Sequence, residues 1–273
     1  MCGIVGYTGT NPALTRVIEG LRRLEYRGYD SAGIALIDSP GKPLVVEKKA
    51  GKLANLESVL NSSFEESRSG IGHTRWATHG GPTDTNAHPH ISNDGKLAVI
   101  HNGIIENYVE LKADLIKRGH TFTSETDTES VAYLLSDEFA QSKDLAAAMR
   151  AVCKQLRGSF TLLALHSDAP EMIVGARRDS PLVVGLGDGE NFLASDVSAF
   201  ISHTKQALEL GQDQVVSVTP SSVTVTDLQG NSISAKQYEI TWDAKAAERG
   251  PTARDCCPVE RASRPAADRK RNP

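Results

Sequence analysis

The sequence predicts an α+β fold of two sheets with helices packed outside them. Strand-like segments come first, three helical segments occupy the middle, and short strands close the sequence. A doubly wound parallel sheet would instead require strands and helices to alternate. The length of 273 residues suits one or two domains, and a single mixed domain of about 200–250 residues is common.

The first half of the chain is expected to supply five strands and two helices. A helix beginning at Asn11-Pro12 is indicated by apolar residues at helical spacing, among them Val17, Leu21 and Leu24. It ends in a polar, glycine-containing loop over 25–31, and a shorter helix is expected over 53–60. The strands expected here cover residues 4–7, 32–37, 44–49, 71–74 and 97–101.

The second half is expected to supply three helices and six short strands. The helices cover residues 107–118, 128–140 and 145–156. The strands cover residues 159–166, 172–176, 182–186, 192–194, 215–218 and 223–225. We expect residues 1–249 to form the folded domain. Residues 250–273 form a Pro/Arg-rich tail with too little apolar surface to fold, so we expect disorder there.

Composition excludes several functional classes. A net charge of −4 with 39% hydrophobic residues gives no bulk attraction to nucleic acid or to an anionic membrane. No run approaches about 18 apolar residues, and no signal peptide is evident. Four cysteines without a disulfide spacing pattern suit a reducing compartment, so we expect a cytoplasmic protein.

Cys2 is the first candidate catalytic residue. If Met1 is trimmed, this one residue carries both a thiol and a free α-amine. The amine, with a pKa of about 7.7–8.0, is a suitable base for a thiol whose reference pKa is about 8.5. The alternative is that Cys2 is simply a small residue before an ordinary strand.

The segment 75–81 has the composition of a binding site for a small zwitterion. Arg75 can hold a carboxylate bidentately, and Thr78 and His79 add further donors, with Trp76 beside them. The alternative is a surface loop whose arginine makes a solvated ion pair.

Two further segments suit the same chemistry. The amide of Asn102 and the backbone N–H of Gly103 can form an oxyanion hole, although Asn-Gly is also a strong hairpin signal. Asp127 can bind a substrate ammonium, although Thr126 and Glu129 also fit a capping box at the start of a helix.

We expect no metal and no cofactor. Five histidines lie close together in the sequence, but their spacing matches no standard ligand pattern. These histidines are His73, His79, His88, His90 and His101. Phosphate-binding loops, dinucleotide fingerprints and a Gly-x-Ser-x-Gly motif are absent from the sequence.

Six motifs in order closely resemble the glutaminase half of glucosamine-6-phosphate synthase, also called glutamine:fructose-6-phosphate aminotransferase (isomerizing). The resemblance covers about residues 1–249. The motifs are Met1-Cys2-Gly3-Ile4-Val5-Gly6, Leu24-Glu25-Tyr26-Arg27-Gly28-Tyr29-Asp30-Ser31-Ala32-Gly33, His73-Thr74-Arg75-Trp76-Ala77-Thr78-His79-Gly80, His88-Pro89-His90, His101-Asn102-Gly103 and Glu125-Thr126-Asp127-Thr128.

The resemblance implies an N-terminal nucleophile hydrolase fold, a four-layer α-β-β-α sandwich of two mainly antiparallel sheets. It also implies that the Cys2 thiolate attacks the side-chain amide of glutamine and that a γ-glutamyl thioester forms. By similarity, Asn102 and Gly103 hold the oxyanion. The substrate carboxylate is bound by Arg75, Thr78 and His79, and the substrate ammonium group is bound by Asp127. Trp76 gates the ammonia path, and Arg27 braces the terminus.

The resemblance also implies a partner. Members of the family continue into a sugar isomerase half that passes the ammonia to fructose 6-phosphate, and we expect that half to be absent here, as in a truncated chain. A homo-oligomer is a further expectation. The alternatives are a non-catalytic remnant and the glutaminase domain of a sibling such as amidophosphoribosyltransferase.

Overall fold

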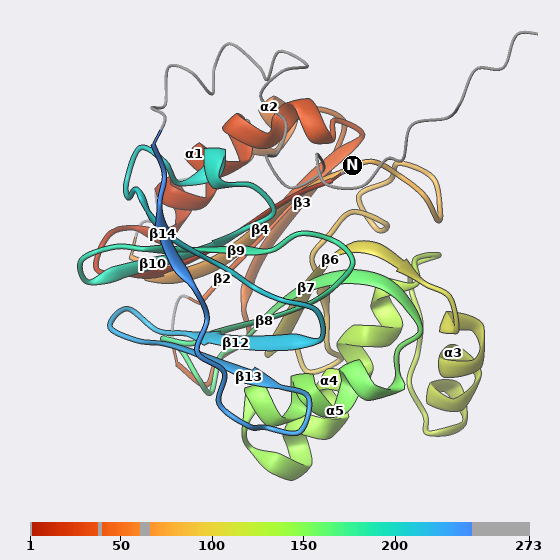
Figure 1. Cartoon of the computed structure of the whole chain (residues 1–273). Helices are drawn as coiled ribbons and strands as arrows, with labels where there is room; N and C mark the ends of the chain where they lie inside the picture. The colour runs from red at the N-terminus through yellow and green to blue at the C-terminus, as the bar shows by residue number, and fades with distance from the viewer. Residues whose placement is uncertain (1, 38–39, 61–65, 242–273) are drawn as a thin grey trace, which may run out of the picture.

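A computed structural model describes residues 2–37, 40–60 and 66–241, and it contains two stacked sheets with helices on both outer sides (Figure 1). Every strand pairing in both sheets is antiparallel. The first sheet has the order β14-β11-β9-β10-β1-β4-β2-β3, and the second has the order β13-β12-β8-β7-β6-β5.

The strands of the first sheet are β1 (Gly3–Gly9), β2 (Ser31–Leu36), β3 (Val45–Ala50), β4 (Ser69–Arg75), β9 (Val183–Leu186), β10 (Glu190–Ala194), β11 (Gln206–Glu209) and β14 (Gln237–Glu239). Those of the second are β5 (His90–Ile91), β6 (Leu97–Ile105), β7 (Gly158–His166), β8 (Ile173–Arg178), β12 (Gln214–Val218) and β13 (Val223–Asp227).

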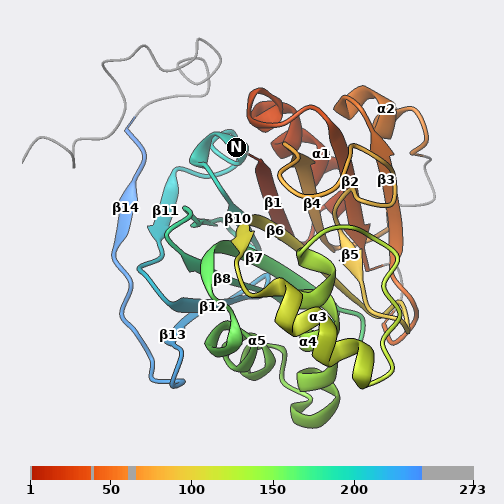
Figure 2. The same cartoon turned by 90° about the vertical axis from the view of Figure 1, so that its right-hand side faces the viewer.

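Helices cover the outer face of each sheet (Figure 2). On the first sheet, α1 (Ala13–Leu24) buries its apolar stripe against residues of β1 such as Val5 and Tyr7. Beside it lies α2 (Leu53–Glu57), and two short 3-10 turns, Glu25–Arg27 and Val197–Ala199, flank α1. On the second sheet pack α4 (Thr128–Ser142) and α5 (Leu145–Gln155), with α3 (Tyr108–Lys117) beside α4. The expected four-layer α-β-β-α sandwich is confirmed.

A third apolar core fills the space between the sheets. Side chains alternate along a strand, so Ile4 of β1 enters this layer while Val5 packs under α1. In β6, Ala98 and Ile100 enter the same layer. In β4, Ile71 also enters this layer. Toward one end of β1, β4 and β6, the residues that follow the same period of two are polar instead of apolar. Those residues are Cys2, His73, Arg75 and Asn102.

The structure corrects the expected end of β6. We expected a strand over 97–101 followed by a loop or hairpin turn at Asn102-Gly103, but β6 continues to Ile105 and pairs with β7 throughout. Asn102 lies opposite Thr161, and Gly103 lies opposite Phe160. Gly103 has a φ of 133°, and a Cβ there would lie 2.0 Å from the carbonyl oxygen of Ser159, so a larger residue would not fit.

Several smaller predictions were also wrong. The helix over 53–60 ends at Glu57, and β5, β11 and β14 were not predicted. The capping box does not form, because Glu129 accepts from the backbone N–H groups of Thr123 and Ser124 instead. The predicted disorder of residues 250–273 lies outside the described residues. Among the described residues, none of the helices has the length and apolar character needed to cross a membrane.

Candidate active site

A cavity of about 320 Å³ lies between the two sheets, beside the start of β1, the end of β4 and the last residues of β6. It is lined by all nine site residues that the sequence predicted, which come from five separate segments of the chain. They are Cys2, Arg27, Arg75, Trp76, Thr78, His79, Asn102, Gly103 and Asp127. Six further residues complete the lining: His88, His101, Ile104, Thr126, Thr128 and Ser180.

Cys2 lies at the wall of the cavity just before β1. Its sulfur accepts a hydrogen bond from the backbone N–H of Trp76 at 3.1 Å and lies 3.5 Å from the Trp76 carbonyl oxygen. Burial raises the pKa of the Cys2 thiol, and the Trp76 N–H offsets this only in part. A buried thiol of this kind needs a base before it can act as a nucleophile.

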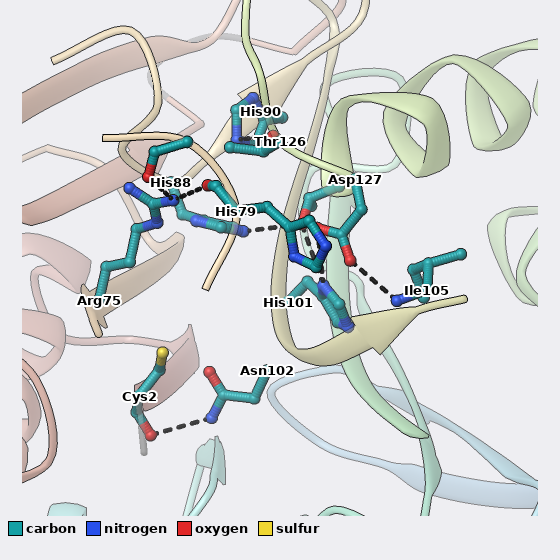
Figure 3. Close-up of polar contacts among 12 residues, drawn as sticks. Cys2, Arg75, His79, His88, His90, His101, Asn102, Ile105, Thr126 and Asp127 are labelled. Atoms are coloured by element: carbon teal, nitrogen blue, oxygen red, sulfur yellow. Dashed lines mark hydrogen bonds and ion pairs between the residues drawn. The ribbon is translucent and has the colours of Figure 1, made fainter. Parts of the chain in front are cut away.

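Asn102 lies beside Cys2 on the facing sheet (Figure 3). Its Nδ2 atom donates to the carbonyl oxygen of Cys2 at 3.0 Å, and its Oδ1 atom lies 3.0 Å from Nε2 of His73. The side-chain amide therefore faces the nucleophile, as an oxyanion donor must. Gly103 follows in the same strand and also lines the cavity.

Arg75 ends β4 and is 3% exposed. Its Nη2 atom donates to the carbonyl oxygens of both His79 and Gly80, and its Nη1 atom donates to that of Gly81 at 3.2 Å. Both bidentate edges of a guanidinium use a hydrogen of Nη2, and both hydrogens are engaged here. In this structure Arg75 therefore fastens the loop over 79–81, and neither edge is fully free for a carboxylate.

Asp127 supplies a buried carboxylate on the other side of the cavity. It accepts from the backbone N–H of Ile105 at 2.8 Å and from the Thr128 hydroxyl at 3.2 Å. His101 approaches to 3.9 Å, but burial lowers the pKa of His101, so the ring is neutral near pH 7. Because His101 does not neutralise Asp127, the carboxylate remains available to a cation.

The remaining predicted residues, Arg27, Trp76, Thr78 and His79, also line the cavity. Trp76 is 50% exposed and meets Tyr29 edge-on, with ring centroids 5.3 Å apart. The ring of His79 meets the ring of Tyr108 edge-on, with ring centroids 5.4 Å apart. Arg27 forms an ion pair with Asp196 at 3.6 Å.

Four buried histidines lie close together at this site, and two of them, His88 and His101, line the cavity. The other two are His73 and His90. The ring of His88 stacks on that of His73, with ring centroids 4.3 Å apart. It meets the ring of His90 edge-on, with centroids 4.8 Å apart. Burial lowers the pKa of each of them, so all are neutral near pH 7. Within the described part of the chain, no group of three or more metal-ligating side chains is placed to hold an ion.

Sequence reasoning missed the part played by Thr128. Its hydroxyl lies 3.0 Å from Nε2 of His88 and 3.0 Å from Nδ1 of His101, and it also contacts Asp127. Thr128 is the last residue of the motif Glu125-Thr126-Asp127-Thr128, but the sequence pattern predicted only that it begins a helix. Its two histidine contacts come from segments far away in the sequence, His88 from the loop before β5 and His101 from β6.

Comparison with known proteins gives a consistent result. Residues 73–202 match the family model of the glutamine amidotransferase domain. The chain is 58% identical over 250 residues to a glutamine–fructose-6-phosphate aminotransferase (isomerizing) of Streptomyces coelicolor, covering 91% of this chain and 40% of the relative. A protein of the same name from Leifsonia xyli is 57% identical, with 92% and 41% covered. The chain thus spans about two fifths of the length of these relatives.

Solved structures share the fold. The glutamine phosphoribosylpyrophosphate amidotransferase from B. subtilis superimposes with a TM-score of 0.70 at 25% identity, covering 85% of this chain and 50% of that one. A class-II glutamine aminotransferase domain protein from Silicibacter pomeroyi has a TM-score of 0.52 at 14% identity, which supports the fold alone.

Proposed function

This chain carries a glutamine amidotransferase domain, and from that premise we propose that it hydrolyses the side-chain amide of glutamine with Cys2 as the nucleophile. The observation that carries the proposal is the single cavity that brings Cys2 together with Arg75, Asn102 and Asp127. A thiol, an amide donor, a guanidinium and a carboxylate match the reacting amide, the oxyanion and the two charged groups of an amino acid.

The proposed reaction begins when the Cys2 sulfur attacks the amide carbon and a C–S bond forms. The thiol proton passes to the α-amine of Cys2, which is free once Met1 is removed, and then to the departing nitrogen, which leaves as ammonia. The side-chain N–H of Asn102 and the backbone N–H of Gly103 stabilise the oxyanion. Water then cleaves the γ-glutamyl thioester, which releases glutamate and restores the thiol.

Substrate binding uses the opposite side of the cavity. We assign the α-ammonium group to Asp127, whose charge is not cancelled by neutral His101. We assign the α-carboxylate to Arg75 together with Thr78 and His79. Because both hydrogens of Nη2 are engaged, a forked contact with Arg75 requires the loop carbonyls to give up at least one hydrogen bond.

Trp76 and Arg27 are assigned supporting parts. Trp76 is half exposed, lines the cavity and contacts the Cys2 sulfur through its backbone N–H, which supports a role in separating the glutamine pocket from the ammonia path. Arg27 lines the cavity near Cys2 and is held by Asp196, which supports a role in bracing the terminus.

The ammonia acceptor belongs to the longer proteins. The relatives are named for transfer from glutamine to fructose 6-phosphate, and we propose that the ammonia released here serves the same acceptor through a sugar isomerase domain. Among the described residues, we identify no second site for fructose 6-phosphate.

The decisive experiment is a glutaminase assay on the chain, with Met1 removal checked by intact mass. Cys2→Ala should abolish glutamate release, and Cys153→Ala is the matched control because Cys153 is fully buried in α5. An active Cys2→Ala variant would reject the mechanism. A parent chain that neither releases glutamate nor gains thermal stability from glutamine would instead support the non-catalytic alternative.

A further inference from the structure

His73 contacts the candidate oxyanion donor directly. Its Nε2 atom lies 3.0 Å from Oδ1 of Asn102 and also 3.0 Å from the backbone carbonyl oxygen of His101. His73 comes from β4 of one sheet, and Asn102 comes from β6 of the other, so the contact crosses the inter-sheet layer. His73 is 1% exposed, and the mechanism proposed above gives it no role.

This contact fixes which way the Asn102 amide points. A backbone carbonyl can only accept a hydrogen bond, so the His101 carbonyl requires a hydrogen on Nε2 of His73. A hydrogen on Nε2 in turn requires an acceptor on Asn102, which is Oδ1. The Nδ2 atom must then face Cys2, where it meets the Cys2 carbonyl oxygen at 3.0 Å.

A flipped amide would lose both contacts. The Nδ2 hydrogens would face the Nε2 hydrogen of His73, and Oδ1 would face the carbonyl oxygen of Cys2. A donor would then face a donor, and an acceptor would face an acceptor. Such unpaired polar groups are costly in a buried site. Asn102 alone has no such preference, because its two amide atoms have nearly the same shape.

The surroundings keep the His73 ring neutral. Burial lowers its pKa to about 3, and Arg75 and His101 oppose a second proton electrostatically. Its Nδ1 atom has no hydrogen-bond partner among the described residues, so a proton there would be unpaired. The neighbouring His88 is neutral as well and stacks on the ring, which limits its rotation.

We propose that His73 is a positioning residue that, through its Nε2–H group, holds the Asn102 amide with its NH₂ group toward Cys2. This inference rests on the proposed function for its effect on catalysis. One Asn102 hydrogen goes to the Cys2 carbonyl, and the other is left for the oxyanion. His73 touches neither the substrate nor the reacting sulfur in this arrangement.

Three substitutions at one position test the proposal by glutaminase kinetics. His73→Leu removes the donor, His73→Gln places an amide nitrogen near the position of Nε2, and His73→Asn places one nearer the backbone. We expect kcat to fall about tenfold or more in His73→Leu and His73→Asn, with the KM for glutamine changed less than about threefold, and His73→Gln to recover most of kcat. Parental kcat in both His73→Leu and His73→Asn would overturn the inference.

A double-mutant cycle with Asn102→Ala separates positioning from general destabilisation. If His73 acts through the Asn102 amide, His73→Leu should cause no further loss of kcat once that amide is gone. Losses that multiply in the double variant would overturn the inference. A parent chain without glutaminase activity would defeat the proposed function instead, which keeps the two failures distinct.

A measurement that needs no activity completes the test. In the ¹⁵N NMR spectrum of the histidine rings, with His73 assigned by its loss in His73→Gln, we expect a neutral ring carrying its hydrogen on Nε2 from pH 5 to pH 8. A hydrogen on Nδ1, or a charged ring in this range, would overturn the inference even in an inactive chain.

Discussion

The two sides of the candidate active site are built in different ways. On the nucleophile side, Asn102 and Gly103 lie within β6, and nine registered pairs join that strand to β7. On the substrate side, Arg75 fastens a loop through the carbonyls of His79, Gly80 and Gly81. Strand pairing fixes the first group before any ligand arrives, whereas the carboxylate that we assign to Arg75 would have to compete with the loop carbonyls.

This difference predicts which kinetic constant each side controls. Groups that are preorganised around the reacting atoms stabilise the transition state and affect kcat. Groups that hold a distant part of the substrate equally well before and during the reaction affect KM. Kinetic constants of variants at Asn102 and Arg75 test this division.

The larger loss of activity is expected on the nucleophile side. Asn102→Ala should lower kcat for glutamine hydrolysis by about 10²–10³-fold with little change in KM, because one oxyanion donor is lost. Steady-state kinetics measure both constants. Asn107→Ala is a matched control, since Asn107 is also buried but bonds to Gln155 and Arg157 away from the cavity. A change confined to KM would break the division.

The next effect concerns the substrate side. Arg75→Ala should raise the KM for glutamine by about 10- to 100-fold, the scale of a charge-assisted hydrogen bond, with a smaller change in kcat. Arg75→Lys keeps the positive charge but loses the forked guanidinium, so its KM should lie between those of the parent chain and Arg75→Ala. The surface variant Arg118→Ala, which removes ion pairs with Asp114 and Asp137, serves as the control. An unchanged KM in Arg75→Ala would refute the assignment of the carboxylate.

Much of the fold followed from local patterns in the sequence. The helical spacing of Val17, Leu21 and Leu24 correctly predicted α1, and the central strands were recognised by their apolar runs. The missed strands β5, β11 and β14 have between two and four residues and are held by their neighbours, so they carry no pattern of their own. Strands this short depend on pairing with a neighbouring strand, which the spacing of their own residues does not reveal.

Asn102-Gly103 shows the same limit at the site. Locally, Asn-Gly favours a tight turn, but pairing with β7 extends the strand through both residues. Of the nine predicted site residues, eight were singled out by their chemistry and position in the sequence, and the resemblance to a known family assigned their roles and added Arg27. Their contacts were not predicted: the bond from His73 to Asn102 and the carbonyls around Arg75 join segments that only the folded chain brings together.

A smaller effect should come from the support of the loop. The backbone N–H of Ala77 donates to Oδ2 of Asp30, which ties the loop to the start of β2. Asp30→Ala should raise the KM for glutamine about three- to tenfold, the scale of one lost hydrogen bond, while kcat changes less. Asp30→Asn keeps a carbonyl acceptor and should have the milder effect. If kcat fell and KM did not, the loop would belong to the nucleophile side.

The smallest effect tests whether the nucleophile side is reactive by itself. Burial raises the pKa of the Cys2 thiol above its ordinary value, so little thiolate exists at neutral pH without a base. In a chain that retains Met1, with Cys256 and Cys257 replaced by serine, alkylation of Cys2 by iodoacetamide should keep accelerating beyond pH 9. Cys153, whose pKa burial raises to about 12, should stay unmodified and acts as an internal control. A rate that levels off near pH 7 would mean that the strand-held environment alone activates the sulfur, and the free amine of Cys2 would then lose its proposed role as the base.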